Sequence, residues 1–233
     1  MPVSIRSALR PALAALAVGL LAAAGCARGT RPTPPEPGAL ARDAMRGLEA
    51  RLMQTPARLE FVAEATGAFV TRWEGSLTLG LGAEVSLRAR AAGDATAGLM
   101  LDARGAATRL GPLDEPRTVR TPAALREAVV IGLSRMGLLH NLARLAEGEL
   151  PDHAGGDVTA WVTVEPTDLG PEVDIEGARA RPITMRILVG GRHTGDATLW
   201  LDETTGLPVR REQVVRFQDG EMQVVERYRV PDA

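Results

Sequence analysis

The chain has 233 residues, of which 45% are hydrophobic and 24% charged, and its formal net charge is −2. No lysine occurs among the 27 basic residues. This nearly balanced charge does not attract nucleic acid or anionic lipid in bulk, so we expect no nucleic-acid partner. Because Cys26 is the only cysteine, no disulfide within the chain can stabilise the fold.

The first 37 residues have the pattern of an export signal followed by a tether. Arg6 and Arg10 precede an uncharged stretch, Pro11–Gly25, which ends in small residues directly before Cys26. A basic start, a short apolar run and small residues are typical of a secretory signal peptide. The run is shorter than the roughly 20 apolar residues of a membrane span. Four prolines in 32–37 favour an extended, semi-rigid tether.

The segment Leu20-Leu21-Ala22-Ala23-Ala24-Gly25-Cys26 resembles the lipobox of bacterial lipoproteins, apart from Ala23, where leucine is more usual. The resemblance implies that the signal is removed and that Cys26 carries acyl chains, palmitate among them, which anchor the protein to a membrane. Ala27 is not the aspartate that retains lipoproteins in the inner membrane in enterobacterial-type sorting. We therefore expect the outer membrane of a bacterial envelope, facing the periplasm. The alternative is an ordinary signal peptide with an incidental cysteine.

From these features we predict a signal peptide over 1–25, a lipidated cysteine and proline-rich tether over 26–37, and a single domain over 38–233. The domain starts with a helix predicted over Leu40–Gln54. Its apolar stripe contains Leu40, Ala44, Leu48 and Leu52, widened by Ala41 and Met45. Thr55-Pro56 ends the helix because the residue before proline disfavours helix.

Beyond this helix the hydrophobic period changes from 3.6 to 2. Alternating apolar residues predict strands over 59–65, 69–81, 85–89 and 99–103. Further strands are predicted over 158–164, 183–189, 197–201, 209–217 and 221–229, the last two joined by a hairpin at Asp219-Gly220. Such regular alternation indicates antiparallel strands with one buried face.

A helical block separates the two groups of strands. It runs from a Thr121 cap to about Glu147 and is apolar on nearly every side, so it must cover two surfaces. Gly132 and Gly137 are weak helix formers and permit a break into shorter helices. An antiparallel sheet with one apolar face needs such a cover, which predicts an α+β fold.

The segment Ala197–Glu212 (ATLWLDETTGLPVRRE), followed by a terminal hairpin, resembles the LolA/LolB-type lipoprotein-carrier superfamily. Its relatives include mycobacterial glycolipid-binding lipoproteins and the RseB-type stress sensor. The resemblance implies a curled antiparallel sheet that forms an unclosed half-barrel, covered by an N-terminal helix and a mid-chain helical lid. In that superfamily the concave interior holds acyl chains.

We therefore expect two groups of side chains around such a cavity, one on the sheet and one on the lid. The expected sheet residues are Trp73, Leu77, Leu79, Leu99, Leu101, Met185, Ile187, Leu199 and Leu201. The expected lid residues are Leu133, Met136 and Leu138. Periodicity alone leaves a fully packed core open as the alternative.

Enzymatic and metal chemistry find no support in the sequence. Ser134 lies near a pattern like the nucleophile elbow, but that motif needs a strand-to-helix turn and this serine falls inside a predicted helix. The three histidines have no metal-ligand spacing. We predict no catalytic residue, metal or cofactor, and a lipoprotein that binds or transfers a lipid or an acylated protein. The alternative is an envelope sensor that docks a protein partner without carrying lipid.

Overall fold

The structure is a computed structural model that describes residues 36–94, 96–151, 162–218 and 220–231. The predicted signal peptide, Cys26 and nearly all of the tether lie outside these residues. So do positions 158–161 of one predicted strand and Asp219 of the predicted hairpin. Pro35–Ala233 forms one compact unit.

The first element is the helix α1 (Pro37–Gln54), which begins three residues before the predicted start. Pro37 occupies its first turn, where a missing N–H costs no hydrogen bond. Its buried stripe contains Ala41, Met45, Leu48 and Leu52. All four belong to the predicted stripe, whereas Leu40, which was also predicted there, is 40% exposed.

Within the described residues, twelve strands form one antiparallel sheet, in two groups separated by the lid. The first group is β1 (Ala57–Gly67), β2 (Thr71–Leu79), β3 (Val85–Ala91), β4 (Gly98–Arg104), β5 (Ala107–Pro112) and β6 (Arg117–Arg120). The second is β7 (Val162–Leu169), β8 (Val173–Ile175), β9 (Ala178–Val189), β10 (Arg192–Asp202), β11 (Pro208–Phe217) and β12 (Gly220–Arg229).

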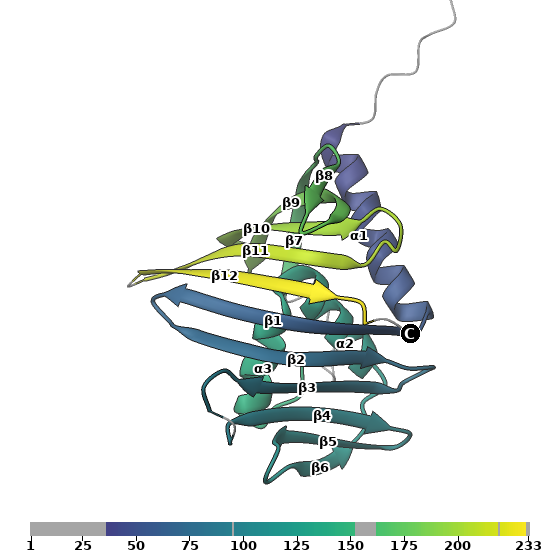
Figure 1. Ribbon diagram of the computed structural model, residues 1–233, viewed down its shortest axis with the longest axis vertical. Helices are drawn as coiled ribbons and strands as arrows, with labels where there is room; N and C mark the ends of the chain where they lie inside the picture. The colour runs from purple at the N-terminus through teal and green to yellow at the C-terminus, as the bar shows by residue number, and fades with distance from the viewer. Residues whose placement is uncertain (1–35, 95, 152–161, 219, 232–233) are drawn as a thin grey trace, which may run out of the picture. The chain divides into compact units, whose positions relative to one another are not determined.

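Each group is a meander, and the two groups meet at the centre of the sheet, where β1 pairs with β12 (Figure 1). The order is β6-β5-β4-β3-β2-β1-β12-β11-β10-β9-β7, with β8 beside β9. Because β6 and β7 stand at opposite ends of this order, the sheet is not closed. The predicted α+β half-barrel with an N-terminal helix and a mid-chain helical cover is therefore confirmed.

Three strands were not predicted, and one predicted strand is shorter. β5 contains Gly111 and Pro112, β6 has four residues with arginine at both ends, and β8 has three residues. None of them carries a long apolar alternation. The strand predicted over 69–81 is confined to Thr71–Leu79, because Phe69 and Val70 belong to the β1–β2 turn.

The lid, Leu125–Ala146, consists of α2 (Leu125–Ile131), the π-helix η1 (Gly132–Met136) and α3 (Leu138–Ala146). Gly132 and Gly137, which were expected to permit a break, lie at the start of η1 and between η1 and α3. Gly137 has a φ of +89°, a backbone conformation that glycine adopts without strain. The lid helices cover one face of the sheet (Figure 1).

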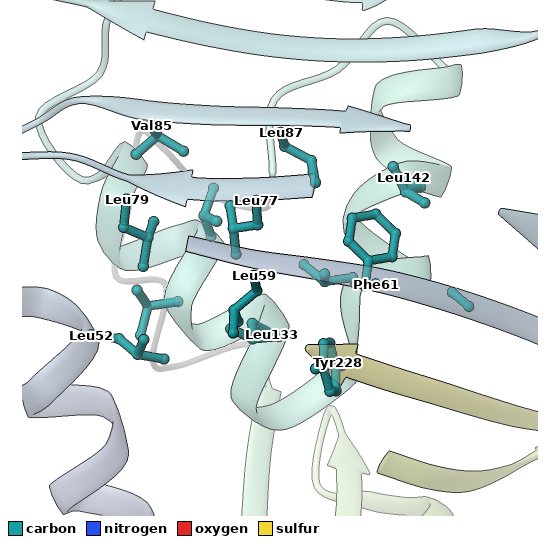
Figure 2. Close-up of a cluster of buried hydrophobic side chains, with 14 of the residues drawn as sticks. Leu52, Leu59, Phe61, Leu77, Leu79, Val85, Leu87, Leu133, Leu142 and Tyr228 are labelled. Carbon is teal, nitrogen blue, oxygen red and sulfur yellow. The ribbon is translucent and has the colours of Figure 1, made fainter. Parts of the chain in front are cut away.

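The hydrophobic core lies between this face and the helices. Figure 2 shows leucines of β1, β2 and β3 directed towards Leu52 of α1, Leu133 of η1 and Leu142 of α3. The Phe61 ring of β1 packs over Gly75 of β2, where a Cβ atom would lie 2.8 Å from the ring. The core is drawn from the Pro35–Ala233 unit itself, as in a domain that can fold alone.

Candidate functional site

An apolar pocket of about 500 Å³ lies between α3 and the sheet. Its floor comes from β2, β11 and β12, and its roof comes from the lid. The lining residues are Phe69, Thr71, Trp73, Met136, Leu139, His140, Leu142, Ala143, Ala146, Glu147, Gln213, Val215, Phe217, Met222 and Val224. Concave apolar sites of about 300–1,000 Å³ are typical of small-molecule binding.

The sequence produces this pocket through two simple patterns. On the floor, the lining residues recur at every second position, as in Gln213, Val215 and Phe217, so their side chains share one face of the sheet. On the roof, Ala143 and Ala146 stand one helical turn apart and present only methyl groups. Short side chains above a regular apolar floor leave the space unfilled.

Two hairpin tips form the mouth of the pocket. The β1–β2 tip carries Phe69, which is 60% exposed, and the β11–β12 tip carries Phe217, which is 53% exposed. The Ala68 amide donates to the Glu221 carbonyl at 2.9 Å and holds the two tips together. Both rings therefore border the pocket and meet water.

Behind the inner end of the pocket, two buried charges hold the break in the lid. Arg211 of β11 and Glu226 of β12 are opposite each other in the strand register, and neither side chain is exposed. Arg211 donates to the Ser134 carbonyl at 3.0 Å and to the Arg135 carbonyl at 2.6 Å. It also donates to Gln213 Oε1, at 2.9 Å from Nη2. The cation thus meets the C-terminal end of η1.

Glu226 meets the other side of the break. Its carboxylate accepts hydrogen bonds from the Leu139 amide at 2.7 Å and the Leu138 amide at 3.0 Å. A cation at a helix C-terminus and an anion at a helix N-terminus both complement the helix dipole. Gly137 lies between them, and a Cβ there would come within 2.7 Å of Glu226 Oε1.

Burial perturbs the titration of the groups beside this break. Desolvation raises the pKa of Tyr228, whose hydroxyl donates to Glu226, well above its usual 10.0, and the carboxylate adds to the rise. Desolvation likewise lowers the pKa of the Arg211 guanidinium, while the Glu226 carboxylate opposes that shift. Both shifts follow from enclosing these groups away from water.

A second buried arginine fastens the other end of the lid. Arg126 of α2 donates to the carbonyls of Leu52 and Thr55, at 2.7 and 2.8 Å, at the end of α1. It also donates to Gly80 and Gly82 in the β2–β3 turn, and desolvation lowers its pKa.

Between the two buried arginines, Glu49 of α1 contacts η1. Its carboxylate accepts from Ser134 Oγ at 2.9 Å and from Arg135 Nε at 2.8 Å. The Arg135 side chain also reaches the other oxygen of Glu49, at 3.0 Å. Three polar contacts, at Arg126, at Glu49 and at the Arg211–Glu226 pair, thus hold the lid on α1, on the β2–β3 turn and on the sheet.

The structure brings two of the predicted lining residues, Trp73 and Met136, to this pocket. The other predicted residues lie in or against the packed core. Those that are fully buried are Leu77, Leu79, Leu99, Leu101, Met185, Ile187, Leu199, Leu133 and Leu138, and Leu201 is partly buried against them. Their contact with a ligand stays a prediction.

Sequence reasoning missed the lining contributed by β11, β12 and the alanines of α3. The alternation of Val215 with Phe217, and of Met222 with Val224, was present in the sequence as a signal. It predicted the strands, but it carried no information about which part of their buried face would remain unfilled. The unfilled part is set by Ala143 and Ala146 of α3, which face β11 and β12 across the pocket.

Reactive chemistry is not evident around the pocket. Among the described residues, no group of three or more His, Cys, Asp or Glu side chains is arranged to hold a metal ion. Ser134, considered as a nucleophile, is a fully buried residue of η1 in the lid, and its hydroxyl donates to Glu49. No helix in the described ranges is long and apolar enough to cross a membrane.

No protein-family model matches the chain, and no curated protein sequence matches it. Similar solved structures include the lipoprotein LppX of Mycobacterium tuberculosis, at 14% identity and a TM-score of 0.42, covering 84% of this chain and 97% of that one. Another is MucB in the MucA/MucB complex of Pseudomonas aeruginosa, at 15% identity and 0.43, covering 82% of this chain and 58% of that one. A LolA superfamily protein from Nitrosomonas europaea has 10% identity and a TM-score of 0.31, covering 83% and 94%.

One of these solved structures is named as a LolA superfamily protein, the superfamily that Ala197–Glu212 resembles in the sequence. The chain spans well under two thirds of the MucB chain. Since all three TM-scores are below 0.5, these likenesses carry no conclusion about a ligand, an activity or a partner.

Proposed function

We propose that this protein is a membrane-anchored bacterial lipoprotein that binds or transfers a lipid or an acylated protein without catalysing a reaction. The observation that carries the proposal is the apolar pocket of about 500 Å³ between α3 and the sheet. An acyl chain that leaves water for such a site gains about 0.8 kcal/mol for each buried CH₂ group. The lid shields the chain from solvent on one side.

The proposed anchor is the acylated Cys26, in the outer membrane and facing the periplasm. One acyl chain gives marginal membrane binding, whereas two or more give stable anchoring. A Cys26→Ser variant should therefore leave the membrane fraction when cells are fractionated. Retention of this variant in the membrane fraction would contradict the proposed anchor.

Native mass spectrometry of Pro35–Ala233, purified from a bacterial periplasm, tests the lipid-binding function. We expect a mass above that of the bare chain, with the excess lost after extraction with organic solvent. The bare mass, unchanged after incubation with envelope lipids, would reject lipid binding and favour docking of a protein partner.

A further inference from the structure

We propose that the pocket takes one acyl chain at a time, so that its ligand is a single-chain amphiphile such as a fatty acid or a lysophospholipid. This inference rests on the proposed lipid-binding function and adds the class of ligand. It is carried by the size of the pocket, by the packing around it and by the distribution of polar groups along it.

The volume of the pocket matches one chain. A water molecule takes a share of about 30 Å³ in the liquid, and a methylene group is of similar size. A pocket of about 500 Å³ therefore has room for roughly 16 methylene groups. Two or three long chains would need two or three times this space.

The neighbouring core offers no further room while the lid is in place. Leu77, Leu101 and Leu199, which stand between the sheet and the helices, are at most 1% exposed and belong to one packed cluster. Interiors of this kind are close-packed and hold few voids larger than a water molecule. A wider cavity would require the lid to break its contacts at Arg126, Glu49, Arg211 and Glu226 together.

The polar groups indicate how the chain lies. At the inner end, the Gln213 amide oxygen already accepts two hydrogen bonds from Arg211. The one carboxylate in the lining, Glu147, is exposed at the end of α3. A charged head group at the inner end would lose its hydration in exchange for little more than the Gln213 amide nitrogen as a donor. The chain therefore enters methyl end first, and the head group stays in water between Phe69 and Phe217.

A chain-length series tests this inference on the Pro35–Ala233 unit. We would measure the Kd of lysophosphatidylcholines with chains from about 10 to about 20 carbons, each below its critical micelle concentration. The affinity should rise about fourfold for each added methylene, up to a length of about 16 carbons, and then stay level. Lysophosphatidylglycerol of equal chain length should bind with similar affinity, because the head group lies outside the pocket.

A pair of alanine-to-tryptophan variants locates the chain. Ala143→Trp puts an indole into the pocket from an exposed position on α3. With this variant, the affinity should stop rising at a shorter chain length. Binding of the 16-carbon lipid should weaken about tenfold or more, which corresponds to two methylene groups excluded from the pocket. Ala50→Trp, on an exposed position of α1 outside the pocket lining, should leave the series unchanged.

The outcomes separate this inference from the proposed function. A diacyl phosphatidylcholine that binds one-to-one, and at least as tightly as the lysolipid, would overturn the single-chain ligand and leave lipid binding intact. If Ala143→Trp leaves the dependence of Kd on acyl-chain length unchanged, the proposed position of the acyl chain beside α3 is wrong. Absence of binding for lysolipids and diacyl lipids alike would overturn the proposed function as well.

Discussion

Arg211 and Glu226 show how two buried charges can be tolerated in an apolar core. Each is enclosed by the sheet and the lid, and each is bonded chiefly to main-chain groups that a helix end leaves without partners. Burying a charge costs several kcal/mol unless good hydrogen bonds replace its hydration. Here the break in the lid supplies carbonyls to the cation and amides to the anion.

The environment of Tyr228 predicts a distinctive alkaline titration. Tyr228 is the only tyrosine, so absorbance near the phenolate band reports this one residue. Because its pKa is raised well above 10.0 in the fold, stability is fully present below the pKa of the unfolded chain and falls as the pH rises beyond it. We expect titration in urea near pH 10 and in the folded protein only at higher pH or together with unfolding. Coincident curves would contradict the burial of Tyr228.

Glu226→Gln removes the charge and leaves one carbonyl oxygen to serve two buried amides. We expect the free energy of unfolding to fall by about 1–3 kcal/mol in urea titrations. Amide exchange at Leu138 and Leu139 should accelerate, since the two amides then compete for one acceptor oxygen. Glu221→Gln, an exposed change on the same strand, is the control. Equal stability of the two variants would show that the carboxylate does not hold the lid.

At the scale of elements, η1 is the irregular part of the lid. Asn141 of α3 presses its buried amide against Gly132, where a Cβ would lie 2.1 Å from the Asn141 oxygen. That oxygen has no hydrogen-bond partner among the described residues, while the amide nitrogen donates to the Val129 carbonyl at 3.3 Å. The close approach needs a residue without a side chain at position 132.

The same substitution should have opposite effects at two helical glycines. Gly47, in the exposed middle of α1, has no atom near its missing Cβ, so Gly47→Ala should stabilise the protein by about 0.5–1 kcal/mol. Gly132→Ala should destabilise it by about 1–3 kcal/mol through overpacking. Urea titrations measure both changes.

Removal of the Asn141 amide provides the internal check on this overpacking. In an Asn141→Ala background, the cost of Gly132→Ala should shrink, with a coupling of about 1 kcal/mol or more between the two sites. Simple additivity of the two changes would mean that the contact does not explain why position 132 is glycine.

The elements differ in how much of their structure the sequence reveals. Long alternation, as in Leu77 and Leu79, predicts strands well because burial of one face dominates their energetics. β6 and β8 are short and lie at or near a sheet edge, so their pairing depends on neighbours that local pattern does not report. The pocket is harder still, because Val215 and Val224 border it only where Ala143 and Ala146 face them.

At the scale of the whole domain, the face opposite the core carries a row of ion pairs across β2, β1, β12 and β11. Glu64 pairs with Arg72 and, at 2.7 Å, with Arg227. Arg227 and Arg210 both reach Glu176, at 3.2 Å. The row joins strands of both meanders across the central β1–β12 seam. Partly exposed pairs contribute about 0–1 kcal/mol each, so the row adjusts stability without dominating it.

This row predicts part of the acid sensitivity. The hydrogen bond from Arg227, followed by that from Arg72, lowers the pKa of Glu64 against the opposing effect of burial. Its contribution is therefore present above the ordinary pKa of 4.5 and is lost as the pH falls through the lowered value. Glu64→Gln should cost about 0.5–1 kcal/mol at neutral pH and progressively less as the pH falls below 4.5. Glu115→Gln, exposed in the β5–β6 turn, is the matched control.

An open sheet exposes two edges, and each edge here is a poor template for another strand. β6 offers four residues with an arginine at either end. β7 contains Pro166, which has no N–H to donate, and its register shifts between Pro166 and Asp168. Short, charged or interrupted edges disfavour pairing with a second chain. A sheet that stays unclosed can therefore persist at high local concentration without growing into aggregates.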